Sequence, residues 1–376
     1  RRITFTRDGV GSYIDENGIL KYASNNTPRF DHDPVTGESL GLLIEESRTN
    51  ILYGTPSQSY TVNTYNLYNS LTGEYNATRL AKNASGNNQS HGSWNWNGNL
   101  STTSFVMSVF VKKINHASFF MQVVSSGVGD NLYVYYNIDT GVTSFTDYSS
   151  PGNLTVTRSI ENYPDGWFRL IARVEGFSNA ALHSGFRFGF AHPSNNSQQY
   201  QDSSDEVLVF GAQAEVGNFA TSYIPTHESA TSVTRGVDTA IIKGTNFTDF
   251  YNASESTIFF ESGVPPVTNS KYFTFHGSDG GGTELIEAAA VSGPGANIFT
   301  YADGTVYSNA QVTDSGATTL KYAAGIKAND INLAINGTLG TTDTSSTQPD
   351  ALDKLIIGNY SSGNYYLNTS IKKLSY

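Results

Sequence analysis

The sequence predicts an all-β protein with two β-sandwich (jelly-roll) domains that follow an extended N-terminal arm. Aromatic residues make up 12% of the chain, and with β-branched residues they fit the half-buried surface of a sheet. The 36 glycines, together with frequent Asn, Ser and Thr, fall in short clusters that suit tight turns between strands. Apolar residues also alternate with polar ones in many short runs, which is the period of a strand.

Length and charge limit the organisation of the chain and its partners. With 376 residues, the chain exceeds what one hydrophobic core usually holds, so we expect two domains and a further segment. The formal net charge of −11, without a run of Lys or Arg, argues against nucleic acid as a partner. No apolar stretch is long enough to cross a bilayer, so we expect no membrane insertion. The absence of cysteine excludes disulfides and thiolate metal sites.

Residues 1–55 are predicted to form an extended N-terminal arm that packs against a later domain. Turn signals separate its short strand-like runs. Pro28 and Pro34 flank a charged cluster, and proline cannot donate to the central ladder of a sheet. Because the sequence begins at Arg1 and not at Met, we expect it to be part of a longer polypeptide.

Residues 56–235 are predicted to form the first sandwich, a jelly roll. Alternating apolar runs cover residues 105–111, 132–138, 168–174 and 186–190. In the first of these runs, Val106 and Phe110 are apolar on the second face as well, which predicts burial on both sides. Several short strands joined by regular turns make a jelly roll the most economical fold.

Residues 236–376 are predicted to form the second β-sandwich. Ile331, Leu333 and Ile335 alternate up to Asn336-Gly337, a pair that favours a hairpin turn because both residues tolerate positive φ. The segment 284–291 has helical propensity, but its all-β surroundings favour a strand or a loop.

Three stretches resemble segments of known proteins. Residues 28–50, PRFDHDPVTGESLGLLIEESRTN, resemble a segment that recurs in tail-fibre and other structural proteins of tailed bacteriophages. Residues 211–226, GAQAEVGNFATSYIPT, followed by Thr234-Arg235, resemble the closing strand and exit of the carbohydrate-binding-module-like jelly roll of those proteins. Residues 327–337, KANDINLAING, and the IIG at 356–358 are similar to concanavalin-like (laminin-G-like) sandwiches.

This resemblance implies a modular subunit on the surface of a phage virion. It implies other virion proteins as partners and a homo-oligomer, with a trimer favoured. It also implies sugar-binding types of fold, although a fold alone does not supply a site, because such sandwiches also serve as spacers and interfaces.

Trp94 and Trp96 are the best candidates for a binding site. They lie two residues apart, so on a strand both rings share one face and can form a platform on which a sugar ring stacks. His91, Asn95 and Asn97 would then be polar neighbours that hold sugar hydroxyls. The alternative is that one or both tryptophans pack in the core of the jelly roll, where large aromatics are usually buried.

No cofactor is predicted. The densest acidic cluster lies in a predicted loop at residues 202–206, and Asp202 and Asp205 are weak candidates for a structural calcium site. A solvated loop is the competing interpretation. The seven histidines show no spacing typical of zinc ligands.

No catalytic residue is predicted, and we do not expect an enzyme. Glycoside hydrolysis needs two carboxyl groups that face one cleft, and no predicted strand carries acidic residues at alternate positions. Glu45, Glu46 and Arg48 superficially match a paired-carboxylate motif. On a strand, however, Glu46 and Arg48 share a face, which favours a structural ion pair that pins the arm.

The sequence therefore predicts a structural protein of a phage fibre, tail or capsid-surface appendage that binds host-surface glycan. Two alternatives stay open. A purely structural capsid fibre or decoration subunit would bury Trp94 and Trp96 in a core or an interface. A polysaccharide depolymerase would place two close carboxylates in a cleft.

Overall fold

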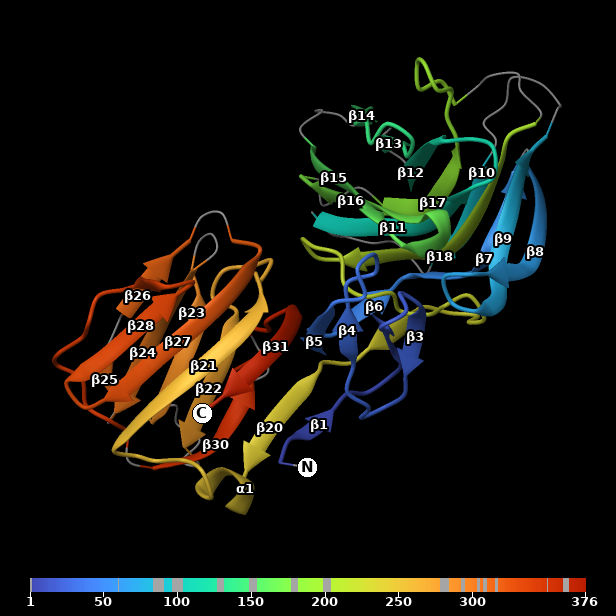
Figure 1. Cartoon of the computed structure of the whole chain (residues 1–376). Helices are drawn as coiled ribbons and strands as arrows, with labels where there is room; N and C mark the ends of the chain where they lie inside the picture. Colours follow the sequence, from blue (N-terminus) through green and yellow to red (C-terminus); the bar gives the residue numbers. More distant parts are fainter. Residues whose placement is uncertain are drawn as a thin grey trace.

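The protein is almost entirely antiparallel β-structure and forms two sandwiches (Figure 1), which confirms the predicted all-β class. The computed structural model describes residues 2–59, 61–83, 91–96, 104–126, 132–148, 154–176, 182–198, 204–277, 284–291, 295–302, 305–306, 310–314, 317–349, 351–360 and 365–376.

The first sandwich consists of two six-stranded sheets. One sheet contains, in spatial order, β14 (Thr143–Asp147), β13 (Leu132–Asn137), β12 (Ser118–Ser126), β17 (Leu182–Phe190), β10 (His91–Trp96) and β7 (Leu52–Ser59). The other contains β15 (Thr155–Asn162), β16 (Trp167–Glu175), β11 (Ser104–Lys113), β18 (Glu206–Val216), β9 (Glu74–Lys82) and β8 (Thr61–Asn69). The short 3-10 helix η1 (Pro164–Gly166) precedes β16.

The core of the first sandwich lies between these two sheets. Phe105, Met107, Val109 and Val111 of β11 alternate into it and are fully buried. Phe110, on the other face of β11, packs in a second buried cluster, so the predicted burial of this strand on both sides is confirmed.

The second sandwich has an eight-stranded and a seven-stranded sheet. The first contains, in spatial order, β1 (Thr4–Thr6), β20 (Thr239–Lys243), β30 (Leu352–Ile357), β22 (Lys271–Gly277), β23 (Leu285–Ala290), β24 (Gly295–Ala302) and β25 (Thr305–Val306), with β26 (Ala310–Thr313) also paired to β24. The second contains β29 (Thr338–Leu339), β28 (Asp330–Ile335), β27 (Thr319–Lys327), β21 (Glu255–Gly263), β31 (Thr369–Ser375), β5 (Ser39–Ile44) and β4 (Phe30–His32).

Local signals account for two elements of the second sandwich. Asn336 and Gly337 turn the chain between β28 and β29 with φ of 49° and 86°, which confirms the predicted hairpin. The ambiguous segment 284–291 contains strand β23 and not a helix. This strand lies between β22 and β24 in the sheet, and all of its residues are buried.

The N-terminal segment contributes strands to the second sandwich, although the whole first sandwich separates the two in sequence. β1 pairs with β20, and β5 pairs with β31. The hairpin of β2 (Gly11–Ile14) with β3 (Leu20–Ala23), and the pair of β6 (Arg48–Asn50) with β19 (Val233–Arg235), complete this segment. In Figure 1 the blue strands β3, β4, β5 and β6 lie between the two sandwiches.

A buried cluster of five charged side chains joins this segment to the chain that links the sandwiches. The carboxylate of Glu45 lies 2.9 Å from Arg29 and 2.8 Å from Arg235. Asp238 pairs with Arg29 and, at 3.3 Å, with Arg7. Their side chains are almost completely buried, so each charge needs its partner, because an unpaired buried charge is strongly unfavourable.

Helical structure is sparse in the part of the chain that the structure describes. The one α-helix there, α1 (Thr245–Thr248), has four residues and does not approach the length needed to cross a membrane.

Candidate functional site

Trp94 lies in the core of the first sandwich and not on an exposed platform. Its side chain is 7% exposed, and its ring centroid lies 5.6 Å from that of Phe186, its partner on the neighbouring strand. This differs from the exposed sugar-stacking position expected from the sequence. The reason is that Trp94 lies on the face of β10 that packs toward the other sheet, beside the core residue Phe186 of β17.

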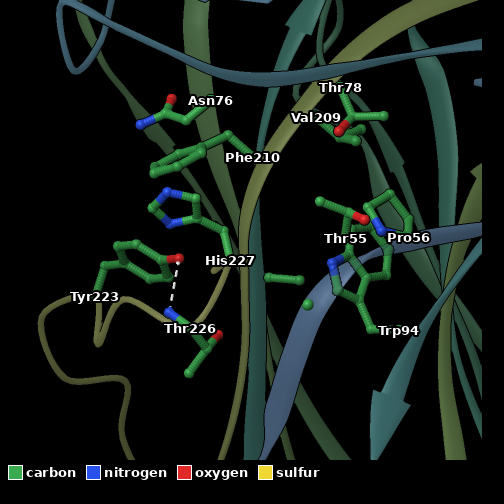
Figure 2. A pocket seen from close by; sticks show the side chains of 13 residues that line it. Thr55, Pro56, Asn76, Thr78, Trp94, Val209, Phe210, Tyr223, Thr226 and His227 are labelled. Carbon is green, nitrogen blue, oxygen red and sulfur yellow. Dashed lines mark hydrogen bonds between the residues drawn. The ribbon is translucent and has the colours of Figure 1, made fainter. Parts of the chain in front are cut away.

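Trp94 also lines a small pocket that is too narrow for a sugar. In Figure 2, Trp94 stands with Thr55 and Pro56 at one end, and Tyr223 and His227 stand at the other. The pocket has a volume of about 20 Å³, which is room for about one water molecule and not for a pyranose ring.

The other residues of the predicted sugar site lie wholly or in part outside the described residues. His91, Asn95 and Trp96 belong to β10, but their side chains lie outside the described residues, and so does the whole of Asn97.

Of the two residues of the predicted calcium site, the structure describes Asp205 alone. Asp202 lies outside the described residues. Asp205 is buried, and its carboxylate lies 3.1 Å from Nδ1 of His116, whose Nε2 lies 2.9 Å from the carbonyl oxygen of Ala191. Asp205 is therefore engaged by a histidine. Within the described ranges, no group of three or more acidic or histidine side chains is placed to hold a metal ion.

Glu45 and Glu46 are both held in ion pairs. Glu46 lies 2.7 Å from Arg48, as expected for a structural pair. Desolvation alone would raise the pKa of Glu45, but Arg235, Arg29 and the hydrogen bonds from Ser222 outweigh it and lower the pKa to about 2. Such a carboxylate stays ionised and paired, which is unsuited to proton transfer near neutral pH.

The structure brings together a different set of residues on the outer face of the second sandwich. On β23 and β24, Ile286 and Ile298 point into the core, so Leu285, Glu287 and Tyr301, which alternate with them, point to the opposite face. On β22 a register shift between Lys271 and Phe273 lets the Lys271 side chain reach Glu287 on that face although Tyr272 and Phe273 both pack in the core. A pocket of about 350 Å³ opens on that face, within the range of small-molecule sites. We call it the tyrosine pocket, and it is lined by Asn269, Lys271, Leu285, Glu287, Tyr301, Tyr360 and Tyr365.

A buried ion pair forms the floor of the tyrosine pocket. Lys271 Nζ lies 2.8 Å from Glu287 Oε1, and both side chains are largely buried. The Lys271 ammonium also lies 5.2 Å from the centre of the Tyr365 ring, and the backbone N–H of Lys271 donates to the Tyr365 carbonyl at 2.8 Å. These contacts fix Tyr365 while leaving its side chain 52% exposed.

Tyr365 adopts an unfavourable backbone conformation. Its φ is 61°, in the left-handed region, where a bulky residue is a genuine outlier. Such conformations persist where the surroundings enforce them, and they are typical of ligand-binding positions. The contacts with Lys271 provide this enforcement here.

The remaining tyrosines complete the wall of the pocket. Tyr360 packs edge-on against Tyr365, with ring centroids 6.4 Å apart, and against His276 at 6.0 Å. Burial, assisted by the charge of Glu287, raises the pKa of Tyr301 and of Tyr360. Both hydroxyls therefore stay protonated at neutral pH and can donate hydrogen bonds.

This arrangement offers aromatic rings next to polar groups whose charges cancel. Oε1 of Glu287 accepts a hydrogen bond from the Lys271 ammonium, while Oε2 takes no hydrogen bond from the described residues. Asn269 adds an exposed amide at the rim. Such a pocket suits a neutral ligand with one apolar face and several hydroxyls.

The sequence analysis missed this pocket. Its tyrosines come from a strand and a distant loop and are three among 23, so no local pattern distinguishes them. One available signal was Glu287, a carboxylate in the otherwise apolar run Leu285–Ala290.

Comparisons with known proteins add little. No family model matches the chain, and no curated protein matches it in sequence. Among solved structures the chain is similar to the mouse laminin alpha1 chain, domains LG4-5, with 12% identity over 83% of this chain and 90% of that chain. The TM-score is 0.28, which is too low to support an argument about the site or the activity.

Proposed function

We propose that this chain is a surface protein of a tailed-phage virion, a subunit of a fibre, tail or capsid appendage that binds host-surface glycan through the tyrosine pocket. The observation that carries the binding role is the presence of Tyr360 and Tyr365 beside the Lys271–Glu287 pair. The proposal therefore assigns the binding role to the second sandwich, whereas the sequence analysis assigned it to the platform of Trp94 and Trp96.

The chemistry of the pocket supports a sugar ligand. The apolar C–H face of a pyranose packs on an aromatic ring, and an exposed, fixed ring such as Tyr365 provides that surface. Glu287, Tyr301 and Tyr360 line the same pocket and supply a carboxylate and two hydroxyls as hydrogen-bonding groups for a sugar. Small-molecule sites usually combine an apolar surface with a small number of polar groups.

The virion location is supported by sequence alone. The stretch 28–50 resembles a segment recurrent in phage fibre proteins, and in this fold it supplies β4, β5 and the buried residues Arg29 and Glu45. This segment adds strands to a distant sandwich and also contributes to a buried charge cluster. Many of its residues therefore cannot be substituted without loss of stability.

We propose binding without hydrolysis. Hydrolysis of a glycosidic bond requires two carboxyl groups across the substrate. Among the described residues that line the tyrosine pocket, Glu287 is the one carboxylate, and Lys271 holds it in an ion pair.

Binding of the purified protein to host-surface polysaccharide tests this function. Tyr365→Ala and Tyr360→Ala are compared with the parent, and reducing ends are assayed in the same samples. The matched control is Tyr148→Ala, which removes a tyrosine that is 59% exposed on the first sandwich. We expect folded Tyr365→Ala and Tyr360→Ala variants to lose binding, the control to retain it, and no reducing ends to appear.

Three outcomes contradict the proposal. A parent that does not bind host polysaccharide argues for a purely structural subunit. Release of reducing ends by the parent makes the protein a depolymerase. Loss of binding in Tyr148→Ala alone moves the site to the first sandwich.

A purely structural role is the second candidate, and an exposed aromatic pair supports it. Tyr68 on β8 and Tyr75 on β9 are register partners with ring centroids 5.6 Å apart, and Tyr68 is 55% exposed. Exposed aromatics of this kind are typical of subunit interfaces. Sedimentation velocity tests this role: we expect the parent to form a homo-oligomer and a Tyr68→Ala, Tyr75→Ala double variant to dissociate.

A further inference from the structure

A second pocket opens on the same face of the same sheet as the tyrosine pocket. It has a volume of about 430 Å³. We call it the lysine pocket, and it is lined by Ile241, Lys243, Gly244, Thr248, Asp353, Lys354 and Ile356. Ile242 and Leu355 point into the core, so Ile241, Lys243, Lys354 and Ile356 belong to the outer face.

Strand register connects the two pockets. Lys243 is the partner of Lys354, Lys354 of His276, His276 of Leu285, and Leu285 of Tyr301. One row of positions therefore runs across β20, β30, β22, β23 and β24, from the lysine pocket to the tyrosine pocket. His276 and Leu285 in the middle of this row are buried, so a ligand that spans both pockets would pass over Tyr360 and not over the row itself. Tyr360, which packs on His276, lies between the two ends. With strands about 4.8 Å apart, the four spacings of this row cover about 19 Å, well beyond one sugar ring.

The two lysines form an unfavourable cross-strand pair. Residues directly opposite each other in antiparallel strands have Cβ atoms about 5 Å apart, and like charges there destabilise a sheet. Neither ammonium donates a hydrogen bond within the described part of the chain. The nearest carboxylate, Asp353, lies 3.9 Å from Lys354 Nζ, so two lysines against one aspartate leave one excess positive charge.

We infer that the outer face of this sheet binds an extended acidic polysaccharide, with a sugar ring on the tyrosines and an anionic group between Lys243 and Lys354. The inference rests on the proposed glycan-binding role of the tyrosine pocket and adds the ligand's charge and length. The charge of the lysine pocket selects an anion, since the overall charge of the chain, −11, repels one elsewhere. Ile241 and Ile356 provide an apolar floor under the chain of sugars.

Binding of defined polymers tests this inference. The probes are polygalacturonate, which carries carboxylates, dextran sulfate, which carries sulfates, and neutral dextran; the two acidic probes distinguish the anionic group. We expect at least one acidic polymer to bind more tightly than dextran. Lys243→Gln and Lys354→Gln should each weaken that binding about tenfold, the effect of one charge-assisted hydrogen bond, and reduce its salt dependence.

Controls separate this inference from the proposed function. Lys327→Gln removes one exposed lysine from the other sheet of the sandwich and should leave binding unchanged. One outcome overturns this inference but not the proposed function. In that outcome Tyr365→Ala abolishes binding of a neutral glycan, while both lysine variants bind the acidic polymers as tightly as the parent does. Equal binding of dextran and both acidic polymers by the parent, or no binding of either acidic polymer, also overturns it. Loss of acidic binding in the lysine variants but not in Tyr365→Ala overturns the tyrosine pocket instead.

Discussion

Lys271 and Glu287 form a buried ion pair, with Nζ 2.8 Å from Oε1, and the same ammonium lies 5.2 Å from the centre of the Tyr365 ring. The pair cancels two charges at the floor of the pocket, and Lys271 also contacts Tyr365, whose backbone conformation is unfavourable. If the pocket binds glycan as proposed, stability and binding should depend on the same three residues.

Breaking this ion pair should lower both stability and binding. Lys271→Met leaves Glu287 buried without its partner, so we expect a loss of about 3–5 kcal/mol in the free energy of unfolding. The double variant Lys271→Met, Glu287→Leu should recover most of that stability but not the binding, because the carboxylate acceptor is gone. Urea denaturation and polysaccharide binding on both variants provide the measurements, and a single variant as stable as the parent would contradict the account.

Glu45 should be essential to the junction between the sandwiches. Glu45→Gln leaves Arg29 and Arg235 without their shared carboxylate in a buried site, and we expect a loss of about 3–5 kcal/mol. Glu38→Gln removes an exposed partner of Lys372 and should cost less than about 1 kcal/mol. Thermal unfolding of the two variants makes the comparison, and equal effects would show that the buried cluster has no special role.

Asp31 should make stability depend on pH in the direction opposite to an ordinary surface aspartate. Burial raises its pKa from 3.8 to about 6, despite the hydrogen bond from the backbone N–H of Ile14. Because the folded state holds the proton more tightly, the stability that Asp31 contributes is complete below pH 3.8 and is lost as the pH rises through about 6. Asp31→Asn keeps the acceptor for Ile14 and removes the charge.

We therefore expect Asp31→Asn to stabilise the protein at neutral pH by up to about 3 kcal/mol and to have little effect below pH 3.8. Unfolding followed as a function of pH measures this difference. A gain that is the same at all pH values would contradict the assignment to ionisation.

Trp94 should act through stability and not through binding. Trp94→Ala opens a cavity beside Phe186 in the core, and we expect a loss of about 3–5 kcal/mol. Trp94→Phe keeps most of the volume and should bind polysaccharide as the parent does. Normal stability of Trp94→Ala combined with lost binding would restore the sugar-stacking platform proposed from the sequence.

Much of the fold follows from local pattern. The alternation of Phe105, Met107, Val109 and Val111 predicts a core strand because side chains of a strand alternate between its faces. Asn336-Gly337 predicts a hairpin because these residues accept positive φ. Both predictions depend only on residues that are neighbours in sequence.

Pairing between distant strands does not follow from local pattern. Leu42 of β5 pairs with Ile371 of β31, and nothing in either segment specifies the other. Register across the sheet also assembles the tyrosine pocket, and this register requires the whole topology. The spacing of Trp94 and Trp96 shows that they share a face of a strand but not whether that face is the core, which depends on the neighbours of β10.

A crystal structure of the protein soaked with oligosaccharides from host-surface polysaccharide tests the central claim most directly. The account predicts a pyranose ring packed on Tyr365 or Tyr360, with a hydroxyl donating to Oε2 of Glu287. A bound sugar elsewhere on the molecule, with the tyrosine pocket empty, would contradict it.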